Sequence, residues 1–305
     1  MSAAMRDHSK QTPSKSSALW LVTASYLMAL SIGWLILAYA PIAEPISRML
    51  LADVVATAVI FGWSVWYDNS SFYDAYWSVI PPAIVGYWIL SADPGLQTLR
   101  VAGVVIVICI WGIRLTWNWA RGWDGLGHED WRYVGFRQSF PRVYWLISFT
   151  GIHLFPTLIV FLSLVAVYPA LTPDSRPIGL IDALALIVGL AGIALEWVAD
   201  DQLRSFTTGS KKSGETLRTG LWRYSRHPNY LGEIMIWWSM YLFGLAASPE
   251  WAKWALVAPL AMTGMFVFVT IPMLERRSLE RRSNYQKVVD ETSMLIPLPP
   301  RNQHR

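Results

Sequence analysis

The sequence predicts an all-α fold, a polytopic membrane helical bundle of about eight transmembrane helices with both termini in the cytoplasm. Of the 305 residues, 54% are hydrophobic and 15% are charged, whereas about a quarter of the residues in an average soluble domain are charged. The apolar residues fall in long blocks. The 18 Trp and 13 Tyr residues suit the boundary between water and lipid, where amphipathic rings are stabilised. This composition excludes an ordinary soluble globule, a disordered chain and a fibrous repeat.

A membrane-spanning helix needs about 20 mostly apolar residues, and eight segments meet this requirement. They are residues 18–40, 50–67, 76–92, 99–119, 143–170, 178–198, 229–247 and 252–273. Asp53 lies near the start of the second segment, and Pro81 and Pro82 lie inside the third. Residues 1–17 are polar, and we expect a cytoplasmic N-terminus there. The apolar run that follows is longer than that of a secretory signal, so we expect residues 18–305 to form a single membrane-embedded domain.

The positive charges gather on one predicted side of the membrane. With the N-terminus inside, most of the 25 Lys and Arg residues fall on segments predicted to be cytoplasmic, in keeping with the positive-inside rule. The three longest polar connections, residues 120–142, 199–228 and 275–305, are all basic and all on that side. A transporter is expected to place its polar groups near the bilayer midplane. The observed pattern instead favours an enzyme that takes an anionic reactant from the cytoplasm and a second reactant from the lipid.

The chain has a single cysteine, Cys109. A lone cysteine excludes an internal disulfide framework and any cysteine-rich metal site. We also predict no metal-ligating residues elsewhere in the chain.

Two arginines close the fourth predicted span. Arg114 and Arg121 are seven residues apart, so they share a face of a helix. Guanidinium groups bind phosphate in a two-pronged geometry, which makes the pair a candidate phosphate clamp. A pair of arginines that snorkel to the membrane boundary is the alternative. Residues 207–220 form a later glycine-containing stretch that fits either an anion-binding loop or a plain solvated loop. Its basic residues are Lys211, Lys212 and Arg218.

A dense polar motif, RYSRHPNYLGE, occupies residues 223–233 and leads directly into the seventh predicted span. Pro228 suits the first turn of a helix, where its missing N–H costs nothing. Asn229 and Glu233 are four residues apart and therefore share a helix face. An amide and a carboxylate on one face can hold a carboxamide, because each supplies what the other lacks. The structural alternatives are a helix cap for His227 and a favourable dipole interaction for Glu233.

A second polar segment, WYDNSSFYDAYW, covers residues 66–77 before the third predicted span. Its Asp74 suits a helix cap at the membrane boundary. A buried acid or tyrosine there is alternatively able to polarise a ketone. On this basis Tyr73, Asp74 and the nearby Tyr87 are our candidate catalytic residues.

These motifs together resemble the steroid 5α-reductase-like membrane reductase family, and most closely the bacterial members grouped with 3-oxo-5α-steroid 4-dehydrogenases. The matching elements are FYDAYW, RLTWNWARGW followed by EDWRY, EWVADDQL, RHPNYLGE, and LERRS followed by IPLPP. They run from about Tyr73 to Arg301. The resemblance implies an oxidoreductase that uses NADPH to reduce a carbon–carbon double bond conjugated to a ketone. The substrate would be lipophilic, either steroid-like or another lipid.

The resemblance also implies a cofactor site within residues 99–305. Asn229 and Glu233 match the family positions that hold the nicotinamide carboxamide, and Arg114 and Arg121 match those that hold phosphates. The further predicted cofactor-binding residues are Arg132, Tyr133, Asp201, Arg218, Tyr224, Arg226, His227, Tyr230 and Arg276. Animal members of the family have seven spans, so this chain adds one at the start. The family's ketone-polarising residues lie in the early spans, where only location supports the catalytic candidates.

Two other functions fit part of the pattern. Isoprenylcysteine-type methyltransferases share RHP-x-Y-x-G and a charged tail ending in Ile-Pro, and they use S-adenosylmethionine. A non-catalytic lipid- or sterol-binding membrane protein is the second alternative. We expect a lipophilic small-molecule substrate that enters from the bilayer and contacts with membrane lipids, but no nucleic acid and no obligate protein partner. The expected location is the bacterial inner membrane, with the active site facing the cytoplasm.

Overall fold

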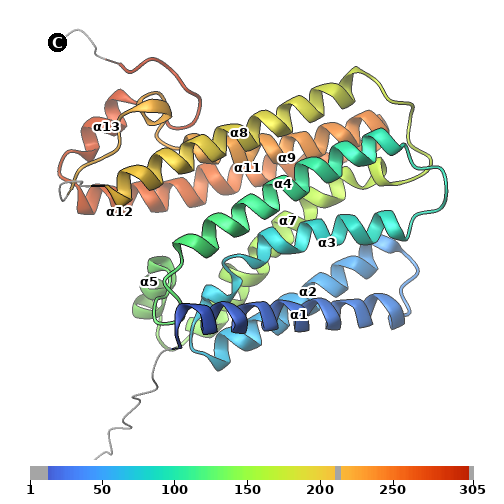
Figure 1. Cartoon of the computed structure of the whole chain (residues 1–305), viewed down its shortest axis with the longest axis horizontal. Coiled ribbons are helices and arrows are strands. Elements are labelled where there is room, and N and C mark those ends of the chain that lie inside the picture. Colours follow the sequence, from blue (N-terminus) through green and yellow to red (C-terminus); the bar gives the residue numbers. More distant parts are fainter. Residues whose placement is uncertain (1–12, 210–213, 302–305) are drawn as a thin grey trace, which may run out of the picture. The chain divides into compact units, whose positions relative to one another are not determined.

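The computed structural model describes residues 13–209 and 214–301 (Figure 1). Within these ranges the regular structure is helical, apart from one isolated parallel bridge between Ser225 and Ser293. The predicted all-α class is therefore confirmed. Most of the predicted polar N-terminus, residues 1–12, lies outside the described residues, as do Lys211 and Lys212.

Among the described residues, six helical segments are long and apolar enough to cross a membrane, so the chain is an integral membrane protein. They are α1 (Lys15–Tyr39), α2 (Pro45–Trp66), α4 (Thr98–Gly122), a segment of α6 (Tyr144–Ile147), η2 (Ser148–Leu154), α7 (Phe155–Val167) and η3 (Tyr168–Leu171), then α8 (Leu180–Thr208), and a segment of α10 (Pro249–Ala255), α11 (Val257–Gly264), η5 (Met265–Thr270) and α12 (Ile271–Arg281). These segments correspond to six of the eight predicted spans.

The other two predicted spans are also helices. The third forms α3 (Tyr76–Leu90), which has 15 residues with Pro81 and Pro82 inside it. At 1.5 Å per residue, such a helix is shorter than the roughly 30 Å hydrocarbon core. The seventh forms α9 (Pro228–Ala247), which has 20 residues. The short helices outside these segments are η1 (Ser70–Tyr73), α5 (Trp131–Ser139), η4 (Gly220–Arg223) and α13 (Tyr285–Glu291).

The chain divides into two compact units, and their boundaries fall inside α3, α4 and α7. The first unit comprises residues 1–80 and 115–158, and the second comprises residues 81–114 and 159–305. In the first unit, α1 and α2 pack through small residues. Gly33 illustrates this, because a Cβ there would lie 3.6 Å from the carbonyl oxygen of Ala52. Small residues let membrane helices approach closely and gain dispersion contacts.

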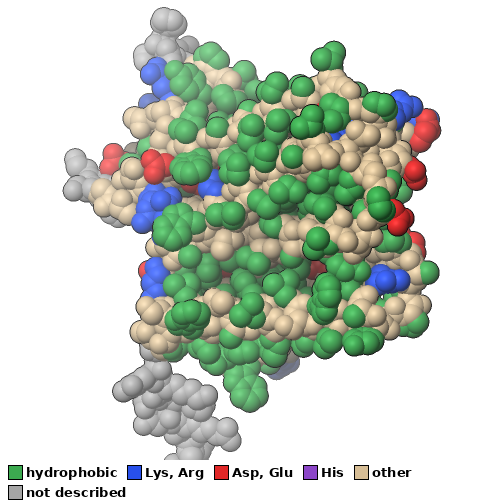
Figure 2. Space-filling view, turned by 45° about the vertical axis from the view of Figure 1, so that its right-hand side comes forward, with side chains coloured by type: hydrophobic (Ala, Val, Ile, Leu, Met, Phe, Trp, Pro, Cys, Tyr) green, Lys and Arg blue, Asp and Glu red, His purple; other side chains and the backbone are tan. Residues whose placement is uncertain are grey.

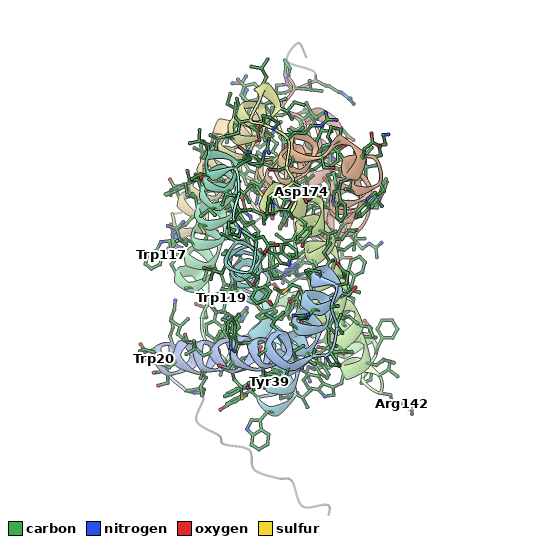
Figure 3. All side chains as sticks on the ribbon, turned by 90° about the vertical axis from the view of Figure 1, so that its right-hand side faces the viewer. Trp20, Tyr39, Trp117, Trp119, Arg142 and Asp174 are labelled. Carbon is green, nitrogen blue, oxygen red and sulfur yellow. The ribbon has the colours of Figure 1, made fainter. Side chains whose placement is uncertain are left out.

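Aromatic side chains project from the first unit at the ends of its helices. Trp20 and Tyr39 extend from α1 and Trp117 from α4, and all three are exposed (Figure 3). Trp66, the last residue of α2, is 82% exposed. Figure 2 shows hydrophobic side chains over the outer surface of the helices. Exposed aromatic rings at helix ends are typical of the membrane–water boundary.

The second unit is organised around the contact between α8 and α9, which Figure 1 draws side by side. Gly192 and Gly232 meet there, because a Cβ on either residue would lie 2.6–2.7 Å from the other's carbonyl oxygen. Only glycine permits so close an approach of two helix backbones. At the far end of α9, a Cβ on Gly244 would lie 1.9 Å from the carbonyl oxygen of Ala166. These contacts fix the position of α9 against its neighbours.

A buried ion pair ties α4 to the start of α8 in the same unit. The Arg100 Nε lies 2.6 Å from Asp182 Oδ1, and its Nη2 donates to Asp182 Oδ2 at 2.9 Å. Its Nη1 donates to the carbonyl oxygen of Arg176 at 2.7 Å. Asp182 also accepts a hydrogen bond from the backbone N–H of Gly179. Because all these groups are paired, the buried charges are satisfied within the unit.

Candidate functional site

The motif RHPNYLGE begins α9, as the sequence predicts. Pro228 occupies the first turn, and His227 precedes it at the N-cap position. The His227 side chain makes no capping hydrogen bond; its Nε2 instead lies 3.0 Å from Glu275 Oε1. The motif is therefore anchored to α12 as well as opening α9.

A buried polar group lies between α4, α8 and α9 in the second unit. Arg114 is ion-paired with both Glu196 and Asp200, and the distance from its Nη1 to Asp200 Oδ2 is 2.9 Å. Asn229 Nδ2 donates to Asp200 Oδ1 at 3.2 Å. Arg114 is buried, so its guanidinium is directed at carboxylates within the protein. Whether it also contacts a phosphate remains a prediction.

Glu233 lies deeper along the same face of α9 and is 2% exposed. Its Oε2 accepts a hydrogen bond from Trp111 Nε1, and its Oε1 accepts one from Trp237 Nε1, both at 2.8 Å. The two indole rings meet edge to face with centroids 5.1 Å apart. Two N–H donors aimed at one carboxylate fix its orientation. We refer to Glu196, Asp200 and Glu233 as the acid cluster.

Asp201, rather than Asp200, is the residue that we predicted from the sequence to bind the cofactor. Asp200 contacts Arg114 and Asn229, whereas Asp201 is exposed. Helical spacing could have identified Asp200 from the sequence, because Glu196 and Asp200 are four residues apart and therefore share a helix face. Trp237 is likewise four residues after Glu233, whereas Trp111 has no such local signal.

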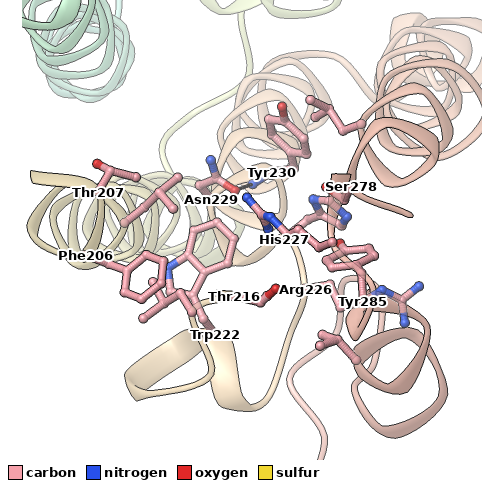
Figure 4. Close-up of a pocket in the computed structure, with 15 residues that line it drawn as sticks. Phe206, Thr207, Thr216, Trp222, Arg226, His227, Asn229, Tyr230, Ser278 and Tyr285 are labelled. Atoms are coloured by element: carbon pink, nitrogen blue, oxygen red, sulfur yellow. Dashed lines mark hydrogen bonds between the residues drawn. The ribbon is translucent and has the colours of Figure 1, made fainter. Parts of the chain in front are cut away.

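A cavity of about 230 Å³ adjoins the start of α9 (Figure 4). Figure 4 draws His227, Asn229 and Trp222 around the same space. The His227 ring stacks on that of Tyr230, with centroids 5.6 Å apart and planes 6° apart. The residues that line the cavity are Leu203, Phe206, Thr207, Thr216, Leu217, Trp222, Arg226, His227, Asn229, Tyr230, Leu274, Ser278, Arg282, Tyr285 and Val288. Four predicted cofactor-binding residues thus share one cavity.

The C-terminal segment is held against the motif by arginines. Arg226 Nε lies 2.6 Å from Glu275 Oε1, and its Nη1 donates to the carbonyl oxygen of Val289 at 3.0 Å. Arg218 is ion-paired with Glu291. Backbone hydrogen bonds reinforce the contact, since the N–H of Arg226 donates to the carbonyl oxygen of Ser293 at 2.8 Å. Both predicted cofactor-binding arginines therefore also secure the tail.

The remaining candidates in the second unit lie outside this cavity. Tyr224 is exposed, and the Arg223 guanidinium lies 5.8 Å from its ring centroid. Arg276 is exposed on α12, and Tyr87 is partly buried on α3. A role for these residues in cofactor binding or catalysis remains a prediction.

In the first unit, the predicted motifs FYDAYW and EDWRY contact each other. Tyr133 donates a hydrogen bond to Asp74 Oδ1 at 2.7 Å. Arg132 pairs with Asp130, with its Nε 2.8 Å from Oδ1. Burial raises the pKa of the Asp74 carboxyl to about 7, against the opposing effect of the Tyr133 hydrogen bond. Asp74 is therefore engaged with α5 and is able to exchange a proton near neutral pH.

Arg121 is also in the first unit. Its Nη2 donates to Asn118 Oδ1 at 2.9 Å, one turn earlier on α4, and its carbonyl oxygen accepts a hydrogen bond from Lys15 Nζ at 3.2 Å. Its side chain remains partly exposed. The predicted phosphate contact of Arg121 stays a prediction.

Tyr73 belongs to a separate buried polar group in the first unit. Its hydroxyl lies 2.7 Å from Thr157 Oγ1, which lies 3.0 Å from Thr57 Oγ1. Burial raises the pKa of Tyr73 above its ordinary value. Asp53 is 2% exposed and close enough for its charge to act on Tyr73, and no described residue forms a hydrogen bond with its Oδ1. The hydroxyl of Tyr76 also has no hydrogen-bond partner among the described residues.

Asp53 is an acid near the start of the second predicted span, and no role is predicted for it from the sequence. An ionisable residue inside a membrane segment is by itself a reason to suspect a functional site. That rule, applied to the second span, identifies Asp53 as a further candidate.

Comparison with known proteins identifies relatives over most of the chain. The family described as "Protein of unknown function (DUF1295)" matches residues 60–292. A protein of Schizosaccharomyces pombe, described as "Uncharacterized protein C594.04c", is 31% identical over 270 residues, which cover 81% of this chain and 78% of the relative. No solved structure matches the chain. The chain belongs to the family described as "Protein of unknown function (DUF1295)".

Proposed function

We propose that the protein is a membrane oxidoreductase that uses NADPH to reduce a carbon–carbon double bond conjugated to a ketone in a lipophilic substrate. One observation carries this proposal. Four of the predicted cofactor-binding residues, Arg226, His227, Asn229 and Tyr230, line a single cavity, and the family resemblance assigns Asn229 among them to the nicotinamide carboxamide. Asn229 also joins this cavity to the buried acid cluster through Asp200.

The cavity suits one end of a dinucleotide. Its volume of about 230 Å³ is below the roughly 300–1,000 Å³ of sites that enclose a whole drug-sized ligand. The Trp222 and Phe206 rings offer flat apolar walls, and Arg282 brings positive charge, whereas the charge of Arg226 is paired with Glu275. Asn229 lines the cavity and supplies an amide for the carboxamide. Glu233 lies deeper on the same face of α9, where its carboxylate accepts hydrogen bonds from Trp111 and Trp237. When bound, NADPH would supply the hydride for the reduction.

The proton donor to the substrate ketone is a separate part of the proposal. Tyr73 and Asp74 remain our predicted proton donors, and we add Asp53 because it is buried beside Tyr73 and no described residue forms a hydrogen bond with its Oδ1. A positioned acid typically contributes about 10²–10⁴-fold to such a reaction. Tyr87 also stays a candidate by location.

The proposal also includes a topology. We count α3 and α9 as spans, which gives eight transmembrane helices with both termini and the active site on the cytoplasmic side. The basic polar connections at residues 120–142, 199–228 and 275–305 support this orientation through the positive-inside rule. The inner membrane of a bacterium is the proposed location.

The test is a comparison of cofactors on detergent-purified protein. Thermal stability is measured while NADPH, NADH and S-adenosylmethionine are each titrated. A ligand at 100 times its Kd stabilises a protein by about 2.7 kcal/mol. We expect stabilisation by NADPH, and we expect Asn229→Ala and Glu233→Ala to weaken it. Glu250→Gln is the control, since Glu250 is exposed and paired with Lys253 on α10.

Each contrary result has a defined meaning. Stabilisation by S-adenosylmethionine alone would replace the reductase with a methyltransferase. Lipid binding with no response to any of the three cofactors would favour a non-catalytic lipid-binding protein. Full NADPH affinity and turnover in both α9 variants would refute the assignment of the site.

A further inference from the structure

The cavity beside α9 has basic residues in its wall and, among the described residues, no acidic one. Arg226, His227 and Arg282 line it, whereas no Asp or Glu does. Arg226 and His227 both contact Glu275, with nitrogen–oxygen distances of 2.6 and 3.0 Å. Arg282 forms no ion pair with any residue that the structure describes; its guanidinium carbon lies 5.9 Å from the ring centroid of Tyr285. The charge of Arg282 is therefore available to an anionic ligand.

Arg282 is held in place where α12 ends. Its backbone N–H donates to the carbonyl oxygen of Ser278 at 3.0 Å, and its own carbonyl oxygen accepts a hydrogen bond from the N–H of Tyr285 at 3.0 Å. Ser278 and Tyr285 also line the cavity, and Figure 4 draws both beside it. A side chain on a fixed backbone loses less freedom when a ligand binds. The end of α12 therefore keeps Arg282 at the cavity wall.

The chemistry of this wall matches a phosphate. A guanidinium binds phosphate oxygens in a two-pronged geometry. Thr216 and Ser278 add hydroxyl groups to the lining, and hydroxyl groups can donate hydrogen bonds to phosphate oxygens as well. Asn229, to which the proposed function assigns the nicotinamide carboxamide, lines the same cavity. One ribose separates the nicotinamide from the diphosphate in a dinucleotide, so neighbouring parts of one wall can bind both groups.

We propose that Arg282 makes this cavity a phosphate-binding site, which takes the diphosphate of NADPH. The inference rests on the proposed function and adds to it the residue that binds the diphosphate. Arg114, to which the family resemblance assigns a phosphate, is ion-paired with Glu196 and Asp200 and is not among the residues that line the cavity. The contact made by Arg282 is therefore separate from the one predicted for Arg114.

The test measures the Kd of NADPH for the full-length protein in detergent, from the change in nicotinamide fluorescence on binding. Arg282→Gln keeps a polar side chain and removes the charge. We expect the Kd to rise about 10- to 100-fold, as for the loss of hydrogen bonds to a charged group. Arg282→Lys keeps the charge but loses the two-pronged geometry, so its Kd should lie between those of the wild type and Arg282→Gln. Damage to the fold would not be repaired by restoring the charge alone.

A matched control lies one residue away. Arg281 is also basic and ends α12, but it is exposed and does not line the cavity. Arg281→Gln removes the same charge and the same favourable interaction with the helix C-terminus, and we expect the Kd of NADPH to stay within about twofold of the wild-type value. Inorganic pyrophosphate is the second probe. It should compete with NADPH for the wild type and for Arg281→Gln, and competition should be about 10- to 100-fold weaker for Arg282→Gln.

The outcomes separate this inference from the proposed function. If the wild type binds NADPH and Arg282→Gln binds it as tightly as Arg281→Gln does, only the inference about Arg282 is overturned. If the wild type binds pyrophosphate through Arg282 but does not bind NADPH, the proposed function is refuted and the phosphate site stands. If vesicles of phosphatidylglycerol compete through Arg282 and pyrophosphate does not, the ligand is a lipid headgroup and the assignment to the diphosphate is overturned. A wild type that binds none of these ligands refutes both proposals.

Discussion

The hydrogen bonds from Trp111 and Trp237 to Glu233 permit a direct test of what holds the candidate site. Trp111→Phe keeps an aromatic ring in the edge-to-face contact and removes the N–H that lies 2.8 Å from Glu233 Oε2. A hydrogen bond to a charged group contributes about 1.5–3 kcal/mol. We therefore expect Trp111→Phe to lower the free energy of unfolding by about that amount.

The assay is a double-mutant cycle. Unfolding is followed in mixed micelles for wild type, Trp111→Phe, Glu233→Gln and the double variant. Partners in direct contact show coupling energies of about 0.5–3 kcal/mol. We expect at least about 1 kcal/mol here, because the pair is buried. Trp66→Phe is the control, since the exposed Trp66 indole should change stability by less than about 0.5 kcal/mol.

One result would refute the reasoning. If Trp111→Phe costs the same with and without the Glu233 carboxylate, the indole stabilises α9 by packing alone. Glu233 would then be oriented by Trp237 or by Arg114. The claim that the Trp111 hydrogen bond holds the Glu233 carboxylate in place would be refuted.

Two further predictions concern pH and packing. Burial raises the pKa of Asp74 to about 7, so the folded protein keeps a proton that the unfolded chain releases near pH 4. The stabilisation that Asp74 provides is thus complete below about pH 4 and is lost as the pH rises to about 7. Asp74→Asn should therefore reduce the change in Tm between these two pH values. Parallel pH profiles of Tm for the wild type and the variant would contradict this. Gly244→Ala should lower the free energy of unfolding by more than about 3 kcal/mol, beyond ordinary overpacking, because its Cβ would lie 1.9 Å from the Ala166 carbonyl oxygen. Gly62→Ala, whose Cβ meets nothing within 4 Å, should leave stability unchanged or raise it by up to about 1 kcal/mol, and equal losses in the two variants would refute the argument.

Local patterns in the sequence predicted the helices well. Hydropathy located six membrane helices, and Pro228 marked the start of α9. Spacing placed Asn229 and Glu233 on one face. These features depend on residues within a few turns of each other, where backbone geometry alone sets which side chains are neighbours.

The same local reasoning missed partners that are far apart in the chain. From the sequence, we predicted that Arg114 binds a phosphate. In the structure, Arg114 is paired with carboxylates more than 80 residues away in the chain. Local reasoning selected Asp201, whereas the phase of α8 turns Asp200 toward Arg114. It noted Asp53 without a role, because its position beside Tyr73 requires α2 and η1 to be packed together.

The sequence by itself determined that this chain is a helical membrane protein, and it gathered the RHPNYLGE residues into the first turns of one helix. Hydrophobic length and helical period need no tertiary information. Only the tertiary structure decided which acids meet Arg114, that Trp111 reaches Glu233 across 122 positions, and that the tail forms one wall of the cavity. The physical reason is that each buried charge takes the partner that packing brings within reach, and the close α8–α9 contact at Gly192 and Gly232 sets that packing.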